Sequence, residues 1–139
     1  MPENRTITVE VIDQAPAAKV WQYWTEPEYI MRWNNASPDW HTPRATNDLR
    51  EGGRFMCRME AKDGSQGFDF GGKYTEVVPQ KRIAYTMDDG RKVSVDFEAK
   101  EERTQVTETF EAESMNAPEM QRQGWQAILD NFRAYVETH

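Results

Sequence analysis

The last stretch of the chain has the clearest hydrophobic pattern. Between Asn116 and Glu137, apolar residues recur at spacings of three and four, which predicts one long amphipathic helix with Gln121 on its polar face. Asn116 is placed to cap this helix, Pro118 is tolerated in its first turn, and Glu119 can reach back to the amide of the cap. The apolar stripe is broad enough to cover a sheet and comprises Met120, Trp125, Ile128, Leu129, Phe132, Tyr135 and Val136.

The first part of the chain predicts one strand and two short helices. Thr6–Asp13 alternates between apolar and polar positions, which indicates a strand. Proline begins each of the helices expected at Ala17–Thr25 and Pro27–Trp33. The next stretch, Asn34–Asn47, has no hydrophobic period and is rich in Asn, Ser, Pro and Thr, so we predict a long loop there.

From Asp48 onward, period-two alternation predicts strands joined by short turns, and Asp89-Gly90 is the strongest turn signal. We expect an α+β fold in which a curled antiparallel sheet of about six or seven strands wraps around the long C-terminal helix. The strands expected in this part are Arg54–Lys62, Phe68–Val78, Arg82–Asp88, Lys92–Lys100 and Thr104–Glu113.

Length, charge and cysteine content narrow the class of protein. A chain of 139 residues predicts a single domain over residues 1–139. The formal net charge of −7 argues against nucleic acid and anionic membranes as main partners. The sequence has neither an apolar leader nor a long apolar run, so we expect a cytoplasmic location. The single cysteine, Cys57, excludes an internal disulfide.

Several short patterns occur in a fixed order along nearly the whole chain. They are Pro16-Ala17-x-x-Val20-Trp21, Pro27 to Trp33, Arg50-x-Gly52-Gly53-x-Phe55, Gly72 with Pro79 and Ile83, Thr107-x-Thr109-Phe110, and Gly124-Trp125 with Leu129. In these patterns the chain resembles the START-like (SRPBCC) superfamily and, within it, the bacterial Hsp90-ATPase-activator-like (AHSA1-like) proteins. The resemblance implies a helix-grip fold with an apolar ligand pocket between the sheet and the last helix. It is less specific for function, because the superfamily holds lipid carriers, hormone receptors, aromatic cyclases and co-chaperone domains.

A sheet that wraps around one helix leaves space between them unless its inward side chains are large. The chain has five Trp, six Phe and five Tyr, which can fill such a space or line a pocket. Strand parity and the helix stripe select the candidate ligand-binding residues, most of which can equally be ordinary core: Trp33, Phe55, Cys57, Met59, Phe68, Phe70, Tyr85, Phe97, Glu108, Trp125 and Leu129.

Two polar residues have two interpretations each. Glu108 shares parity with Phe110 and should point inward, where a carboxylate is costly unless it is paired or protonated. Arg50 or Arg58 is a candidate partner for it; alternatively, Glu108 lies at a sheet edge and is solvated. His41, in the predicted loop, can bind or protonate a ligand at the cavity mouth, or is simply solvated.

The sequence contains no familiar catalytic constellation and no metal-ligand spacing. His41 and His139 are the only histidines, and neither is spaced to share a metal with Cys57, so we expect no metal and no cofactor. Cys57 has an apolar parity, which favours an inert core thiol. Asp69 should face outward, between Phe68 and Phe70.

We consider three functions for this chain. The favoured one is a cytoplasmic binding protein for a small apolar or aromatic ligand. The second is a cyclase-type enzyme in which Glu108, His41 or Tyr85 acts as acid or base on a bound polyketide-like compound. The third, a chaperone-associated (Hsp90-type) interaction domain, rests on the family resemblance alone.

Overall fold

The computed structural model describes residues 6–35, 37–114 and 116–139. In this part of the chain there are three helices, α1 (Ala17–Thr25), α2 (Pro27–Trp33) and α3 (Pro118–Thr138). The same residues form seven strands, β1 (Thr6–Asp13), β2 (Trp40–Asn47), β3 (Arg54–Ala61), β4 (Gly67–Val78), β5 (Arg82–Met87), β6 (Lys92–Lys100) and β7 (Arg103–Glu111). The bounds predicted for β1, α1, α2 and β6 are confirmed, and the other predicted helix and strands differ from the observed ones by one or two residues at one or both ends.

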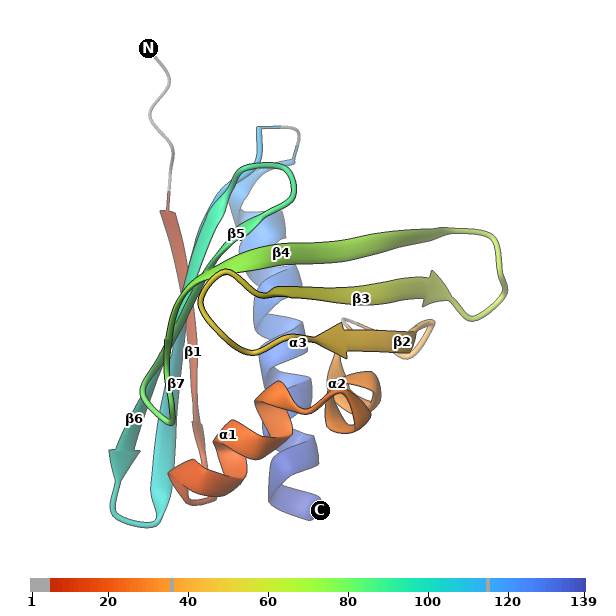
Figure 1. Cartoon of the computed structure of the whole chain (residues 1–139). Coiled ribbons are helices and arrows are strands. Elements are labelled where there is room, and N and C mark those ends of the chain that lie inside the picture. Colours follow the sequence, from red (N-terminus) through yellow and green to blue (C-terminus); the bar gives the residue numbers. More distant parts are fainter. Residues whose placement is uncertain (1–5, 36, 115) are drawn as a thin grey trace.

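The seven strands of the described residues form one antiparallel sheet in the order β1-β7-β6-β5-β4-β3-β2. β1 and β2 are therefore the two edges, and α1 and α2, which lie between them in the sequence, cross from one edge to the other (Figure 1). The sheet curls around α3 (Figure 1), so the predicted α+β helix-grip fold is confirmed. No helix in the described ranges is long and apolar enough to cross a membrane.

The long loop predicted over Asn34–Asn47 is wrong in its second half, which forms β2 and pairs with β3. Residue 36 of this stretch lies outside the described residues. β2 is an edge strand with a polar sequence, so it lacks the apolar alternation that marks the other strands. Pro43 lies where the register shifts between His41 and Arg44. An edge strand tolerates proline there because no ladder hydrogen bond is needed from it.

The core forms where the inward face of the sheet meets α3. Phe132 of α3 is fully buried, and its ring lies edge-on against the rings of Trp24 and Trp33, at centroid distances of 5.0 and 4.8 Å. The side chains of lowest exposure in this core are Val9, Val20, Ile83, Val95, Val106, Phe110, Leu129, Phe132 and Val136. The alternation read from the sequence therefore places the correct face of each of these strands inward.

β4 passes unusually close to its neighbours at Gly71 and Gly72. A Cβ atom on Gly71 would lie 2.7 Å from the carbonyl oxygen of Phe55, and one on Gly72 would lie 2.6 Å from that of Thr86. Both distances are too short for any side chain, so glycine is required at these two positions. The double glycine therefore lets the strongly curved β4 (Figure 1) pair this closely with β3 and β5.

The start of α3 differs from the predicted one. Ala117, not Asn116, is the cap residue, and no side chain hydrogen-bonds to the first turn as a cap. Glu119 forms an ion pair with Arg122 instead of reaching back to a cap. Pro118 occupies the first turn, as predicted.

Two residues near this start also exchange their predicted environments. Met120, assigned to the apolar stripe, is 62% exposed, whereas Gln121, assigned to the polar face, is buried. The Gln121 side chain accepts a hydrogen bond from the Glu113 N–H at 2.9 Å and donates to the carbonyl oxygens of Glu113 and Asn116 at 3.1 and 2.8 Å. One buried amide thus ties the segment after β7 to the helix.

Substitution of Gln121 by alanine should destabilise the protein by about 1–3 kcal/mol, because it leaves partly buried backbone groups of Glu113 without partners. Denaturant unfolding measures this loss. Gln123→Ala, an exposed change in the same turn, is the control and should stay within about 0.5 kcal/mol of wild type. Equal midpoints for the two variants would show that Gln121 does not hold the helix start.

Candidate ligand-binding cavity

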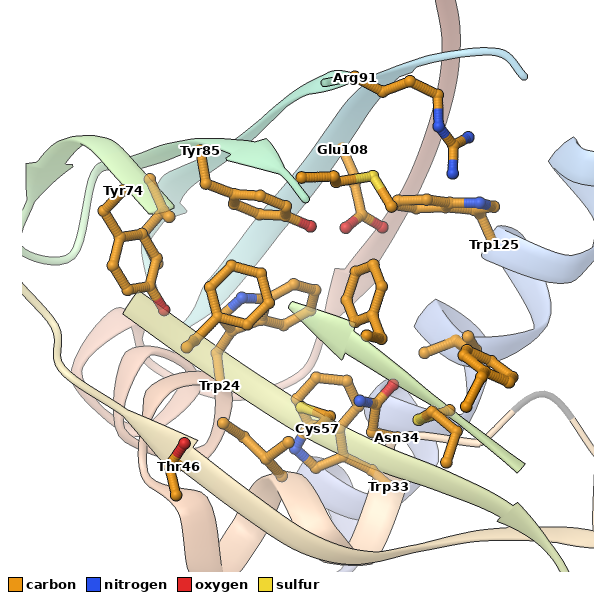
Figure 2. Close-up of a pocket in the computed structure, with 18 residues that line it drawn as sticks. Trp24, Trp33, Asn34, Thr46, Cys57, Tyr74, Tyr85, Arg91, Glu108 and Trp125 are labelled. Carbon is orange, nitrogen blue, oxygen red and sulfur yellow. The ribbon is translucent and has the colours of Figure 1, made fainter. Parts of the chain in front are cut away.

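A pocket of about 270 Å³ lies between the concave face of the sheet and the helices (Figure 2). Ligand pockets typically span about 300–1,000 Å³, and an apolar cavity of about 150 Å³ is enough to bind benzene. The volume therefore suits a small molecule of one or two rings.

Most of the residues predicted for a ligand site lie in the wall of this pocket. These are Trp33, Phe55, Cys57, Met59, Phe68, Phe70, Tyr85, Glu108 and Trp125. Phe68 is half exposed and lies beside Trp40, with their ring centroids 5.8 Å apart, so it belongs to the rim. The structure thus brings these residues together, and their binding role stays a prediction.

Phe97 and Leu129, also predicted for the site, are not part of the wall. Phe97 lies on β6 under α1, where the rings of Trp21 and Trp24 approach it edge-on at 5.3 and 5.8 Å. Leu129 is fully buried in the core. Both were selected by the correct alternation, but α1 covers Phe97 on the inner face of the sheet, and Leu129 lies on the fully buried side of α3.

Sequence reasoning also missed half of the wall: Trp24, Ile30, Asn34, Thr46, Tyr74, Ile83, Met87, Arg91 and Ile128. Ile83, Met87 and Ile128 carried a usable signal, since each shares strand or helix parity with a predicted wall residue. Thr46 could not be selected because the segment that contains it was predicted to be a loop. Arg91 follows a hairpin turn, where no period indicates the direction of a side chain.

Stacked rings hold the apolar part of the wall in place. The Trp125 ring lies flat on the Phe110 ring, with centroids 3.9 Å apart and an interplanar angle of 10°. Phe55 packs edge-on against Tyr85 at 4.7 Å and against Phe70 at 5.7 Å. Such contacts limit rotation of the rings, so the cavity presents a fixed, largely aromatic surface.

Glu108 is the acidic residue of this wall. It lies on β7, an inner strand between β1 and β6, directly opposite Val9 and Val95. Only 6% of Glu108 is exposed, so the alternative of a solvated position at the sheet edge is wrong. Burial raises the pKa of Glu108 to about 8, so its carboxyl group is largely protonated at neutral pH.

The two arginines considered as partners do not reach Glu108. Arg50 pairs with Asp48 at 3.0 Å, and Arg58 pairs with Glu60 at 2.9 Å. In the described part of the chain, no side chain donates a hydrogen bond to the Glu108 carboxyl or forms an ion pair with it. Protonation, rather than pairing, is what makes its burial tolerable.

Tyr85 and Arg91 lie at the same end of the cavity. The Tyr85 hydroxyl points toward the Glu108 carboxyl (Figure 2), and burial together with the Glu108 charge raises the pKa of Tyr85 well above its usual value. Arg91 bonds to Asp89 at 2.9 Å and donates to the carbonyl oxygen of Glu111 at 3.3 Å. This end therefore combines a hydroxyl, a neutral acid and a guanidinium group.

The polar groups at the opposite side of the pocket already have partners or are inert. The Tyr74 hydroxyl donates to the side-chain oxygen of Asn47 at 2.6 Å. Burial raises the pKa of the Cys57 thiol to about 11, so it stays protonated at neutral pH. This agrees with the prediction of an unreactive thiol, although Cys57 lines the pocket.

The remaining polar candidates lie outside the cavity. His41 is on β2, with its side chain 44% exposed and 4.0 Å from the Glu60 carboxylate, and it does not line the pocket. Asp69 faces outward, as predicted, with a side chain that is 61% exposed. Among residues 6–35, 37–114 and 116–139, no three His, Cys, Asp or Glu side chains are grouped to hold a metal ion.

Comparison with known proteins gives one family and several similar structures. The family model described as activator of Hsp90 ATPase homolog 1-like protein matches residues 14–137. The solution NMR structure of an AHSA1-like protein from Aeromonas hydrophila is 48% identical, over 96% of this chain and 93% of that one, with a TM-score of 0.91. None of the curated proteins compared matches this chain.

Two further structures extend this likeness. A solution structure from Cytophaga hutchinsonii is 50% identical, over 96% of this chain and 92% of that one, with a TM-score of 0.83. A crystal structure from Chromobacterium violaceum is 25% identical, over 96% and 98% of the two chains, with a TM-score of 0.82. The similarity therefore runs over nearly the full length of each chain.

Proposed function

This chain belongs to the activator of Hsp90 ATPase homolog 1-like family, and from that premise we propose that it binds a small apolar or aromatic ligand in the cavity between the sheet and α3. The START-like fold of the family is consistent with a ligand-binding domain. The observation that carries the proposal is the largely aromatic wall, in which Trp33, Phe55, Phe70 and Trp125 border open space.

A ligand in this space would be bound mainly by burial of apolar surface. Each Å² of apolar surface removed from water contributes about 25 cal/mol, so a ligand of one or two rings gains several kcal/mol before any polar contact forms. Ligand pockets are typically apolar with a few placed polar groups, and this wall has that composition.

The direct test is native mass spectrometry of protein purified from cells, compared before and after denaturation. A small molecule that is released only on denaturation supports the proposal. A mass equal to that of the bare chain, together with no binding of an environment-sensitive apolar dye by the native protein, would reject it.

Met59→Trp should abolish dye binding while the protein stays folded. Met59 is buried in the cavity wall, so the larger indole would fill the space. Overpacking typically costs about 1–3 kcal/mol, and a denaturant midpoint measured alongside the dye titration separates this cost from unfolding.

Met56→Trp is the matched control for this substitution. Met56 lies on the same strand, β3, but its side chain points outward and is 38% exposed. The Met56→Trp variant should bind the dye as wild type does. Undiminished dye binding by folded Met59→Trp, or equal loss in both variants, would show that the dye does not occupy this cavity.

A cyclase-type enzyme is the second candidate, and Glu108 and Tyr85 favour it because both face the cavity with ionisable groups. In that case a carbonyl compound held against Trp125 would be activated by proton transfer from these groups. Conversion of such a compound by wild type, but not by Glu108→Gln, would support catalysis over binding alone.

A further inference from the structure

Two polar side chains in the cavity wall have no partner among the described residues. Glu108 is 6% exposed and Tyr85 is 8% exposed, yet neither the carboxyl nor the hydroxyl forms a hydrogen bond or an ion pair there. Buried polar groups in proteins nearly always have a partner, as the Tyr74 hydroxyl has in Asn47. Glu108 and Tyr85 are therefore placed to receive a group that this chain does not supply.

The sheet brings these two residues to one place. Tyr85 on β5 lies opposite Val93 of β6, and Glu108 on β7 lies opposite Val95 of the same strand. Both side chains thus project from the concave face on either side of β6. Figure 2 shows the hydroxyl and the carboxyl directed into the same part of the cavity, beside Trp125.

The charges around this point favour a ligand oxygen over a ligand ammonium group. The titratable side chains in the wall are Cys57, Tyr74, Tyr85, Arg91 and Glu108. Burial raises the pKa of Glu108 to about 8, so at neutral pH both Glu108 and Tyr85 offer an O–H donor. The charge of Arg91 is partly offset by its ion pair with Asp89, and with Glu108 neutral the described residues of the wall carry no negative charge to hold a ligand cation.

We propose that the Tyr85 hydroxyl and the Glu108 carboxyl both donate hydrogen bonds to one oxygen atom of the ligand, so that the cavity selects a ring compound with a phenolate- or enolate-type oxygen. A tyrosine beside a carboxylic acid that an apolar site keeps neutral is a known arrangement for binding an oxygen with negative charge. The flat face of Trp125, stacked on Phe110, would hold the ring. This inference rests on the proposed function, since it names the ligand class of the same cavity.

The probe for this proposal is 4-nitrophenol, because its phenol and phenolate forms have different absorption spectra. We expect wild type to bind the phenolate form and to shift the probe toward that form at a pH where the free probe is mostly phenol. Tyr85→Phe should weaken binding roughly 10- to 100-fold, the loss expected when a hydrogen bond to a charged group is removed.

Glu108 is tested by its pH dependence and by two variants. Above pH of about 8, ionised Glu108 repels the phenolate, so wild-type affinity should fall. Glu108→Gln keeps a neutral donor, so it should bind the probe without this fall, whereas Glu108→Leu should lose roughly 10- to 100-fold. Thr86→Val, which changes the outward residue beside Tyr85, is the matched control and should behave as wild type.

The outcomes separate this inference from the proposed function. Binding of 4-nitrophenol as the neutral phenol, an unchanged affinity in Tyr85→Phe, or the same pH profile in wild type and Glu108→Gln would each overturn the two-donor site. If the native protein takes up the apolar dye but not 4-nitrophenol, the two-donor site is rejected while the binding function stands. If it takes up neither, both are rejected.

Discussion

Phe132→Ala should destabilise the protein by about 3–5 kcal/mol, the usual cost of truncating a fully buried phenylalanine. Phe132 has no exposed surface, and its ring packs edge-on against those of both Trp24 and Trp33. These three rings join α1, α2 and α3, so removal of the Phe132 ring would remove ring contacts from α3 to both α1 and α2. Denaturant unfolding of wild type and variant measures the difference.

Met120→Ala is the matched control on the same helix. Met120 is 62% exposed, so its truncation should change stability by no more than about 0.5 kcal/mol. A loss of less than about 1 kcal/mol in Phe132→Ala would contradict the packing of α3 against α1 and α2, because collapse of the site cannot recover most of the buried area of a phenylalanine.

Because Asp13 is buried, we expect the free energy of unfolding to fall as pH rises from about 4 to about 7. The Asp13 side chain is fully buried, and neither carboxyl oxygen has a hydrogen-bond partner in the described residues. Burial and the nearby Glu137 raise the pKa of Asp13 from 3.8 to about 7, against an opposite effect of Arg133. The folded state thus holds a proton over a pH range in which the unfolded chain has lost it.

The direction of the effect follows from this difference in bound protons. Stability contributed by Asp13 is complete below pH 3.8, declines as pH rises, and is lost by about pH 7. At about 1.4 kcal/mol for each pKa unit, the whole change is about 4 kcal/mol. Glu108, with its pKa raised to about 8, acts in the same direction and extends the decline.

Asp13→Asn isolates the contribution of Asp13. Its free energy of unfolding is measured with denaturant at about pH 4 and about pH 8. The difference between these two pH values should be about 4 kcal/mol smaller than in wild type. Asp39→Asn, an exposed substitution, should keep the wild-type pH dependence. A wild-type profile in Asp13→Asn would show that Asp13 is ionised in the folded protein.

Much of the fold is determined by local sequence. Alternation over Thr6–Asp13 and over the hairpin strands sets which side chains face inward, and the pleat of a strand makes that choice independent of distant residues. The spacing of Leu129, Phe132 and Val136 likewise sets the buried stripe of α3. Nine residues of the cavity wall could be selected for the same reason.

The alternation along a strand does not determine which other elements a residue contacts. β2 is a strand only because β3 offers its edge, and its own polar sequence carries no alternation. Phe97 and Trp125 were both selected as wall residues, but α1 covers Phe97, whereas Trp125 borders open space. The exchange of environments between Met120 and Gln121 depends on where the chain leaves β7.

The chemistry of the site depends most on tertiary structure. Parity predicted that Glu108 points inward, but its protonation follows from an inner position in the sheet between Val9 and Val95. The burial of Asp13 depends in the same way on elements far from it in sequence. Burial and pairing are properties of surroundings assembled from the whole chain. The sequence alone therefore determined the elements and their inward faces, and only the tertiary structure decided which of the inward polar groups lack partners.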